Sequence, residues 1–119
     1  MALESDTQSA VIRDVRSWGQ YAYSYKVIKA NDVGIPDFFC CTKVSGAFQI
    51  EFKRPDGDGV VSAAQVEKRE NSQKVGLQTF LVETTKDWVA LKKYLGLSVK
   101  SLKEAGLDDL HDPYCYRKA

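Results

Sequence analysis

Apolar and polar residues alternate along several short stretches of the chain, and the clearest of these is Phe48–Lys53. Side chains of a strand repeat every two residues, so the three apolar residues of this stretch share one side. Glu51 and Lys53 share the other side. The pattern predicts a half-buried strand that carries a carboxylate and an ammonium group next to each other on its polar face.

The same patterns predict one α/β domain with the element order α-β-β-β-α-β-α. Helices are expected at 4–18, 62–75 and 85–95, and strands at 21–28, 37–41, 48–53 and 79–82. The strand–helix–strand unit from Glu51 to Val82 requires a parallel crossover, which gives a mixed β-sheet flanked by helices. The continuous apolar run Thr79–Val82 indicates a central strand.

Two stretches of this plan carry polar or aromatic residues that allow more than one interpretation. Ser5 and Gln8 have the spacing of a capping box at the start of the first helix. Tyr21, Tyr23 and Tyr25 lie on one side of the first strand. Such a tyrosine row can stack on nucleic-acid bases, but tyrosines are common in strands, and we expect these rings to pack in the core.

Length, charge and cysteine content limit the class of protein. A chain of 119 residues with a net charge of +1 has room for one core and carries no marked basic excess. A purely electrostatic nucleic-acid binder is therefore disfavoured, whereas an enzyme whose bound metal supplies the positive charge is not. Three cysteines without metal or disulfide spacing fit a reducing cytosol. The chain shows neither a signal peptide nor an apolar run of membrane-spanning length, so we expect no secretion and no membrane partner.

The domain is expected to span residues 1–96, followed by a C-terminal tail at 97–119. Charges dominate this tail, and a short helix is expected at Ser101–Ala105. Its scattered leucines and tyrosines leave two possibilities open, packing on the parent domain or forming a dimer interface.

The candidate chemistry lies in Gly34–Asp37 and in the Glu51 strand. If the strand that Asp37 opens pairs with the Glu51 strand as a hairpin, Asp37 comes to lie beside Glu51. Two converging carboxylates suit Mg²⁺ or Mn²⁺, since Mg²⁺ takes one or two carboxylates and keeps water for phosphate oxygens. Lys53 would then orient an attacking water or offset phosphate charge. The alternative is a solvated strand face preceded by a Pro-Asp turn.

The ordered set Gly34-Ile35-Pro36-Asp37, Ile50-Glu51-Phe52-Lys53 and Ser62-Ala63-Ala64-Gln65 resembles the PD-(D/E)XK nuclease superfamily. Within it the chain is most similar to the VRR-NUC family over about residues 4 to 95, and archaeal-type Holliday junction resolvases share much of the pattern. The resemblance implies a metal site made by Asp37, Glu51 and the backbone carbonyl of Phe52.

The resemblance also implies supporting roles for two further residues. Gln65 would reach back to the catalytic strand, although its spacing from Ser62 equally fits a helix cap. Glu4 would be a third acid near the metal, although an acid in the first turn also complements the helix dipole.

Three basic residues are candidates for contacts with nucleic acid, namely Arg54, Lys68 and Arg69. Arg54 opens a turn-rich loop that extends to Gly59 and fails the pattern of a calcium-binding loop. Lys68 and Arg69 lie close to the Gln65 face of the predicted helix and either hold a phosphate backbone or belong to a solvated charged face.

The sequence therefore predicts a Mg²⁺- or Mn²⁺-dependent endonuclease that hydrolyses phosphodiester bonds of structured DNA, with branched (Holliday) junctions as the leading substrate. A homodimer is expected, because a two-fold symmetric junction needs two active sites. The alternatives are a flap, gap or single-strand nuclease, a non-catalytic DNA-binding module with the same fold, and a plain structural domain.

Overall fold

A computed structural model describes residues 4–28, 31–54 and 61–109. Its elements confirm the predicted order, with a short 3₁₀ helix added after the first helix and a final short helix present in the tail. They are α1 (Glu4–Ser17), η1 (Gly19–Tyr21), β1 (Tyr23–Lys26), β2 (Phe38–Thr42), β3 (Gly46–Phe52), α2 (Ala63–Lys74), β4 (Gln78–Val82), α3 (Thr85–Leu95) and α4 (Val99–Ala105).

The strands in the described residues form one mixed sheet in the order β1-β2-β3-β4. The first three are antiparallel, and β3 and β4 are parallel, as the crossover through α2 requires. The prediction that Thr79–Val82 is a central strand is wrong, because β4 lies at an edge of this sheet. α2 and α3 both contact β4, but only Val82 of this strand is buried, and Leu81 stays 39% exposed.

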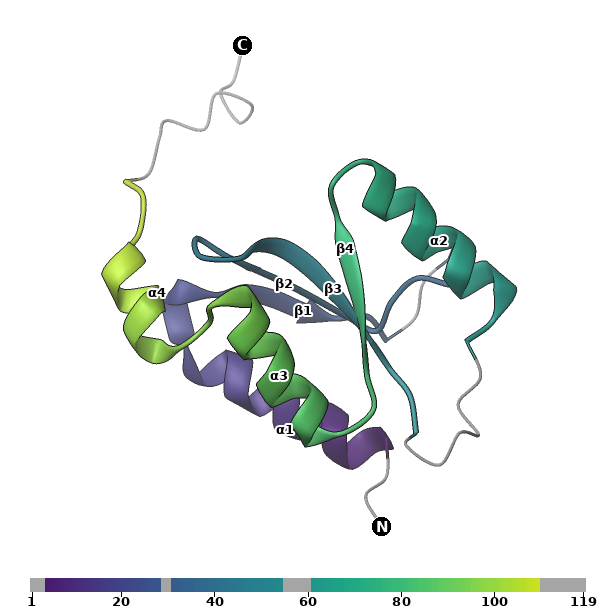
Figure 1. Cartoon of the computed structure of the whole chain (residues 1–119), viewed down its shortest axis with the longest axis horizontal. Helices are drawn as coiled ribbons and strands as arrows, with labels where there is room; N and C mark the ends of the chain where they lie inside the picture. Colours follow the sequence, from purple (N-terminus) through teal and green to yellow (C-terminus); the bar gives the residue numbers. More distant parts are fainter. Residues whose placement is uncertain (1–3, 29–30, 55–60, 110–119) are drawn as a thin grey trace.

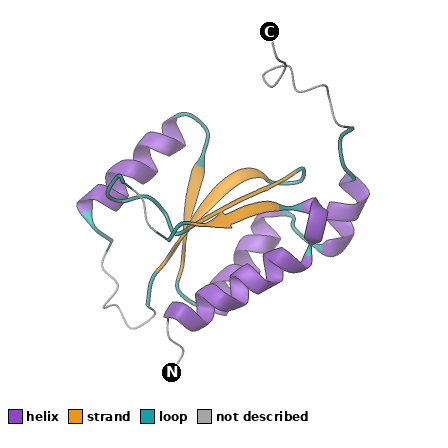
Figure 2. Cartoon of the chain, turned by 180° about the vertical axis from the view of Figure 1, so that it is seen from behind, coloured by secondary structure: helices purple, strands orange, loops and turns teal. Residues whose placement is uncertain are grey.

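Helices lie on both faces of the sheet. α1 and α3 run side by side across one face, and α2 lies on the other (Figures 1 and 2). The core is between the α1–α3 layer and the sheet, and it includes Val11, Val15 and Trp18 from α1 and Phe48, Ile50 and Phe52 from β3. The apolar side predicted for the third strand is therefore confirmed, and Glu51 and Lys53 belong to the face on which α2 lies.

A polar network fixes the two helices of the core layer to each other. The Asp14 carboxylate of α1 accepts hydrogen bonds from Trp88 Nε1 and Lys92 Nζ of α3, each at 2.7 Å. The Trp18 ring stacks on the Trp88 ring with centroids 6.1 Å apart. This layer packs against the strands that carry the candidate site.

Two local predictions in the first part of the chain are wrong. α1 includes Glu4 and Ser5, so Ser5 lies inside the helix and cannot cap it. The strand predicted from Tyr21 is shorter, because Tyr21 belongs to η1, and Tyr23 and Tyr25 remain 67% and 48% exposed instead of packing in the core. Their side of β1 is the sheet face that α1 and α3 leave open.

The beginning of the predicted tail packs on the domain, since Leu97 and Leu102 are buried in the same core cluster. His111, Cys115 and the rest of 110–119 lie outside the described residues. No helix in the described ranges is long and apolar enough to cross a membrane.

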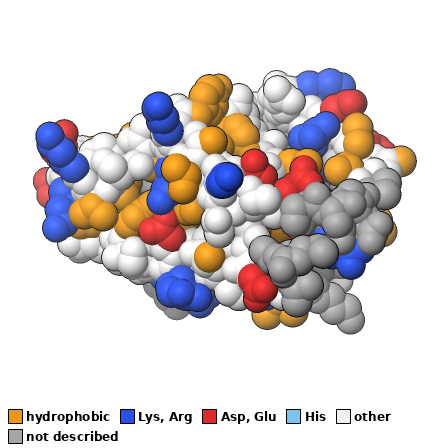
Figure 3. All heavy atoms as spheres, turned by 60° about the horizontal axis from the view of Figure 1, so that its bottom comes forward, with side chains coloured by type: hydrophobic (Ala, Val, Ile, Leu, Met, Phe, Trp, Pro, Cys, Tyr) orange, Lys and Arg blue, Asp and Glu red, His pale blue; other side chains and the backbone are white. Residues whose placement is uncertain are grey.

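On the face seen from the side of α1 and α3, lysine and arginine side chains stand in separate groups, with acidic, apolar and uncharged groups between them (Figure 3). The described part of this face shows no continuous basic surface, in keeping with the net charge of +1.

Candidate active site

The pairing of β2 with β3 brings Asp37 to Glu51. Phe38 lies opposite Ile50 in the antiparallel register, so the residues just before and just after them are neighbours. Asp37 Oδ2 accepts a hydrogen bond from the Phe52 backbone N–H at 2.9 Å, and the Asp37 carboxyl also forms a hydrogen bond with Glu51. The predicted hairpin between these two strands is confirmed, and it sets two acids side by side.

Glu51 is a buried acid, with 7% of its surface exposed. Burial raises the pKa of Glu51 to about 8, and the charge of Asp37, the hydrogen bond to it and the charge of Glu4 act in the same direction, whereas Lys53 opposes them. With a pKa of about 8, the Glu51 carboxyl holds a proton near neutral pH. A cation at the same place would replace this proton, because it stabilises both charged forms.

Lys53 follows directly after β3 and stays next to Glu51. Its Nζ lies 3.9 Å from Glu51 Oε1, and only 14% of the side chain is exposed. Its backbone N–H donates to the Val82 carbonyl at 3.2 Å, which extends the pairing with β4 by one residue. The ammonium group is thus held on the site face by the sheet.

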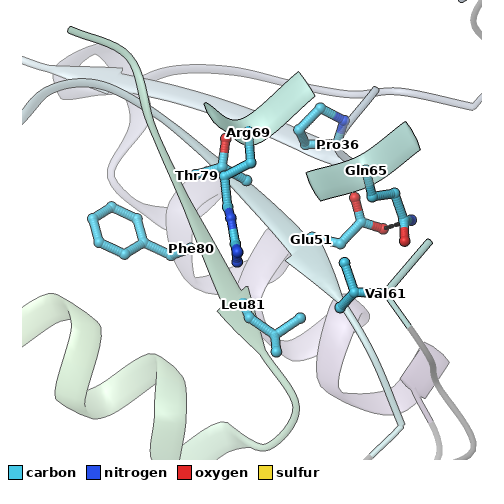
Figure 4. Close-up of a pocket in the computed structure, with 8 residues that line it drawn as sticks. All are labelled: Pro36, Glu51, Val61, Gln65, Arg69, Thr79, Phe80 and Leu81. Carbon is cyan, nitrogen blue, oxygen red and sulfur yellow. Dashed lines mark hydrogen bonds between the residues drawn. The ribbon is translucent and has the colours of Figure 1, made fainter. Parts of the chain in front are cut away.

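Gln65 makes both of the contacts considered for it, the helix cap that its spacing allowed and the reach back to the Glu51 strand that the resemblance implied. Its Oε1 accepts from the Ser62 backbone N–H at 2.9 Å, while the Ser62 side chain accepts from the Gln65 N–H, which completes a capping box. Its Nε2 donates to Glu51 Oε1 at 2.9 Å (Figure 4). The start of α2 is therefore joined to the Glu51 carboxylate by one amide side chain.

Gly34 allows the loop before Asp37 to approach α2. Its φ is +86°, and a Cβ placed there would lie 2.5 Å from the Ala64 carbonyl oxygen and 2.9 Å from the Gln65 backbone nitrogen. Only glycine fits this contact and this backbone conformation without strain. The sequence pattern included Gly34 but did not reveal this role, which requires knowing that the loop packs on the helix.

We expect Gly34→Ala to lower the free energy of unfolding by about 2–4 kcal/mol, as the sum of the left-handed conformation and the backbone clash. Gly19→Ala is the matched control, because Gly19 has φ +57° but no atom within 4 Å of the place that an added methyl carbon would take. Urea denaturation of both variants separates the two contributions. Equal losses of stability would show that the Gly34 contact with α2 does not matter.

Glu4 and Arg69 approach the site from α1 and α2. Glu4, the first described residue of α1, is half-buried and close enough for its charge to act on Glu51. Arg69 and Glu51 line the same cavity of about 20 Å³, which has room for about one water (Figure 4). A substrate as large as a nucleotide therefore cannot enter this cavity and would have to lie across the open face of the sheet.

The structure says less about the other two basic candidates for nucleic-acid contact, Lys68 and Arg54. Lys68 Nζ lies 3.9 Å from the carboxylate of Asp32, so it joins α2 to the loop before the Asp37 strand. Arg54 is half-buried directly after Lys53. The rest of its predicted loop, 55–60, lies outside the described residues.

The oxygen groups at this place would suit a hard divalent ion that takes few protein ligands. In the described part of the chain, no cluster of three or more His, Cys, Asp and Glu side chains is arranged to hold a metal. Asp37 and Glu51 instead form a pair, and Mg²⁺ is commonly held by one or two carboxylates with several waters. The adjacent carboxyls of Asp37 and Glu51 fit such an ion, and Phe52, whose backbone N–H bonds to Asp37, would add its carbonyl oxygen.

The raised pKa of Glu51 gives a testable dependence of stability on pH. A carboxyl whose pKa is about 8 in the folded protein and 4.5 in the unfolded chain binds more proton in the folded state between these values. In EDTA, the free energy of unfolding should therefore fall as pH rises from about 4.5 to about 8, and Glu51→Gln should flatten this slope. Urea denaturation across this range measures it, and equal slopes for the two proteins would contradict the assignment.

Comparison of the chain with protein-family models gives no match, and comparison with curated proteins gives none. The function must therefore be inferred from the residues of the chain itself.

Proposed function

We propose that this protein is a Mg²⁺- or Mn²⁺-dependent endonuclease that hydrolyses phosphodiester bonds of structured DNA. The observation that carries the proposal is the surroundings of one oxygen atom, Glu51 Oε1. This oxygen accepts from Gln65 at 2.9 Å, lies 3.9 Å from Lys53 Nζ, and belongs to a buried carboxyl that is hydrogen-bonded to Asp37.

The burial of Glu51 favours a catalytic site over a structural domain. Removing a carboxylate from water costs free energy unless binding partners compensate for it. A carboxylate on a solvated strand face would not carry this cost. Here the carboxyl is placed against a second acid, which raises the cost further. Such an arrangement is typical of sites in which function requires charged groups to converge.

In the proposed mechanism, Asp37, Glu51 and the carbonyl of Phe52 would hold the ion. When bound, the ion polarises the scissile phosphate and lowers the pKa of an attacking water. Gln65 fixes the orientation of the Glu51 carboxylate. Lys53 orients the water or offsets the negative charge that develops on the phosphate. The sheet already holds its ammonium group beside Glu51, so this charge is preorganised.

Glu4 and Arg69 are assigned supporting roles. The Glu4 carboxylate would hold a water of the ion, because it lies within electrostatic range of Glu51 but is not hydrogen-bonded to it among the described contacts. Arg69 would contact a phosphate that lies next to the scissile one outside the small cavity, since it stands on α2 near Glu51. Arg54 and Lys68 remain candidates for contacts farther along the DNA backbone.

The ordered motif on a mixed sheet supports membership of the PD-(D/E)XK superfamily and similarity to the VRR-NUC family. That resemblance is the reason to propose branched junctions as substrate and a homodimer as the active form. Light scattering tests the dimer: a mass near 13.3 kDa, with and without junction DNA, would exclude it and favour flap or gap substrates.

The proposed activity can be tested with a panel of end-labelled DNA forms that includes a four-way junction, a flap, a gap, a single strand and a blunt duplex. Each is incubated with the protein in Mg²⁺, Mn²⁺ or EDTA. We expect cleavage of at least one structured form with either ion and none in EDTA. Absence of cleavage of every form in both ions would contradict the proposal.

A further inference from the structure

Three aromatic rings form an exposed cluster on the sheet face that α1 and α3 do not cover. The Tyr25 ring stacks on the Phe39 ring, with centroids 5.0 Å apart and planes inclined by 19°. The Tyr23 ring meets both of them edge-on, at 6.1 and 6.3 Å. Tyr23 and Tyr25 are 67% and 48% exposed, so much of each tyrosine side chain is open to solvent.

The register of the sheet places this cluster next to the candidate active site. Tyr25 pairs with Phe39 and Phe39 pairs with Gln49, which makes one row across three strands. Phe39 is two residues after Asp37, and Gln49 is two residues before Glu51. Because strand side chains repeat every two residues, the aromatic row and the acidic pair are adjacent rows on the same face.

A basic groove lies on the other side of the same edge strand. Lys26, which follows Tyr25 and points to the opposite face, lines an open groove of about 390 Å³ together with Arg13 and Arg16 of α1. None of these three cations forms an ion pair with an acid in the described residues. β1 is an edge of the described sheet, so a flexible strand could pass around it from aromatic rings to cations.

From these placements we infer that Tyr23, Tyr25 and Phe39 form a stacking platform for unpaired bases of the DNA whose backbone reaches Asp37 and Glu51. Single-stranded nucleic acid is held by aromatic rings that stack on bases and by a basic groove that follows the phosphates. The inference rests on the proposed nuclease function and narrows its substrate class. It favours forms with unpaired nucleotides beside a duplex, such as flaps and gaps, over a fully paired four-way junction.

Base pairing explains this preference. A base within a duplex is stacked between its neighbours and cannot lie on a protein ring, whereas an unpaired base offers its face without that cost. The three rings are presented by paired strands, so little ordering is needed when a base binds. Arg13, Arg16 and Lys26 would hold the phosphates that follow.

Fluorescence anisotropy in EDTA tests this without cleavage, using a labelled 15-nucleotide oligo-dT and a blunt duplex of the same length. We expect Tyr25→Thr, which keeps a strand-favouring residue but removes the ring, to weaken oligo-dT binding about tenfold. The same change should alter duplex binding less than about twofold. Tyr25→Phe should bind oligo-dT like the wild type, because it keeps the ring.

Tyr94→Thr is the matched control, because Tyr94 is a 72% exposed tyrosine on α3, across the sheet from the platform. It should leave both affinities unchanged. Arg13→Gln combined with Arg16→Gln should weaken both DNA forms and reduce the dependence of binding on salt. Thermal denaturation of every variant confirms that it folds.

The inference would be overturned if Tyr25→Thr bound oligo-dT as tightly as the wild type does. It would also be overturned if Tyr25→Thr lost as much affinity for the duplex as for oligo-dT. A third contrary outcome is a change from dimer to monomer on Tyr25→Thr with oligo-dT binding intact. The last would assign the rings to contact between two copies of the chain. Failure of the nuclease proposal is distinguished by a different result, namely no cleavage in Mg²⁺ while the anisotropy differences remain.

Discussion

Asp37→Asn should abolish Mn²⁺ binding and reduce DNA cleavage by about 10³-fold or more, because charge stabilisation by a bound ion is worth several kcal/mol in the transition state. The substitution is chosen because asparagine keeps an oxygen that can accept the hydrogen bond from the Phe52 N–H. The pairing of β2 with β3 is then preserved while the negative charge is removed. Titration calorimetry with Mn²⁺ and single-turnover cleavage measure the two effects.

Asp32→Asn is the matched control for this experiment. Asp32 is an exposed aspartate in the loop before the same strand, and its partner is Lys68, not Glu51. It should bind Mn²⁺ like the wild type. Unchanged Mn²⁺ binding by Asp37→Asn would mean that the ion, if there is one, binds elsewhere.

Lys53→Met should reduce cleavage by on the order of 10²-fold or more and leave a Mn²⁺ site that can still be titrated, since a preorganised charge in an active site is typically worth that much. Methionine keeps most of the apolar stem of a side chain that is only 14% exposed. Single-turnover rates at saturating metal isolate the contribution of the ammonium group from any change in metal affinity.

Lys43→Met controls for the loss of a paired lysine. Lys43 lies in the turn between β2 and β3, at the end of the hairpin away from Asp37, and its Nζ is 2.8 Å from Asp108. This variant should cleave like the wild type. If Lys53→Met also does so, Lys53 is a neighbour of the site without a part in the chemistry.

The sequence predicted the parts of this fold that depend on local periodicity. Alternation in Phe48–Lys53 gave the correct buried face of β3, and the Ser62–Gln65 spacing gave the correct start of α2. The ordered motif also indicated that Asp37 and Glu51 would meet, because an antiparallel hairpin between their strands brings these two residues opposite each other.

The parts that could not be predicted depend on which neighbour covers each residue. An apolar run at 79–82 looks the same in a central strand and in an edge strand that helices contact, so the edge position of β4 was not visible. A row of alternating tyrosines fits either a core or an open face, and only the placement of α1 and α3 on the other side decides it. The close contact of Gly34 with Ala64 likewise needs the tertiary structure.

The most direct measurement of the central claim compares wild type and Glu51→Gln, purified side by side, in single-turnover cleavage of the best substrate of the DNA panel. Glutamine keeps the oxygen that accepts from Gln65 and removes only the charge. In Mg²⁺ the wild type should cleave, EDTA should stop it, and Glu51→Gln should cleave at background rate. Equal rates for both proteins in Mg²⁺ would contradict the account, because the cleavage would then come from another site or from a contaminating nuclease.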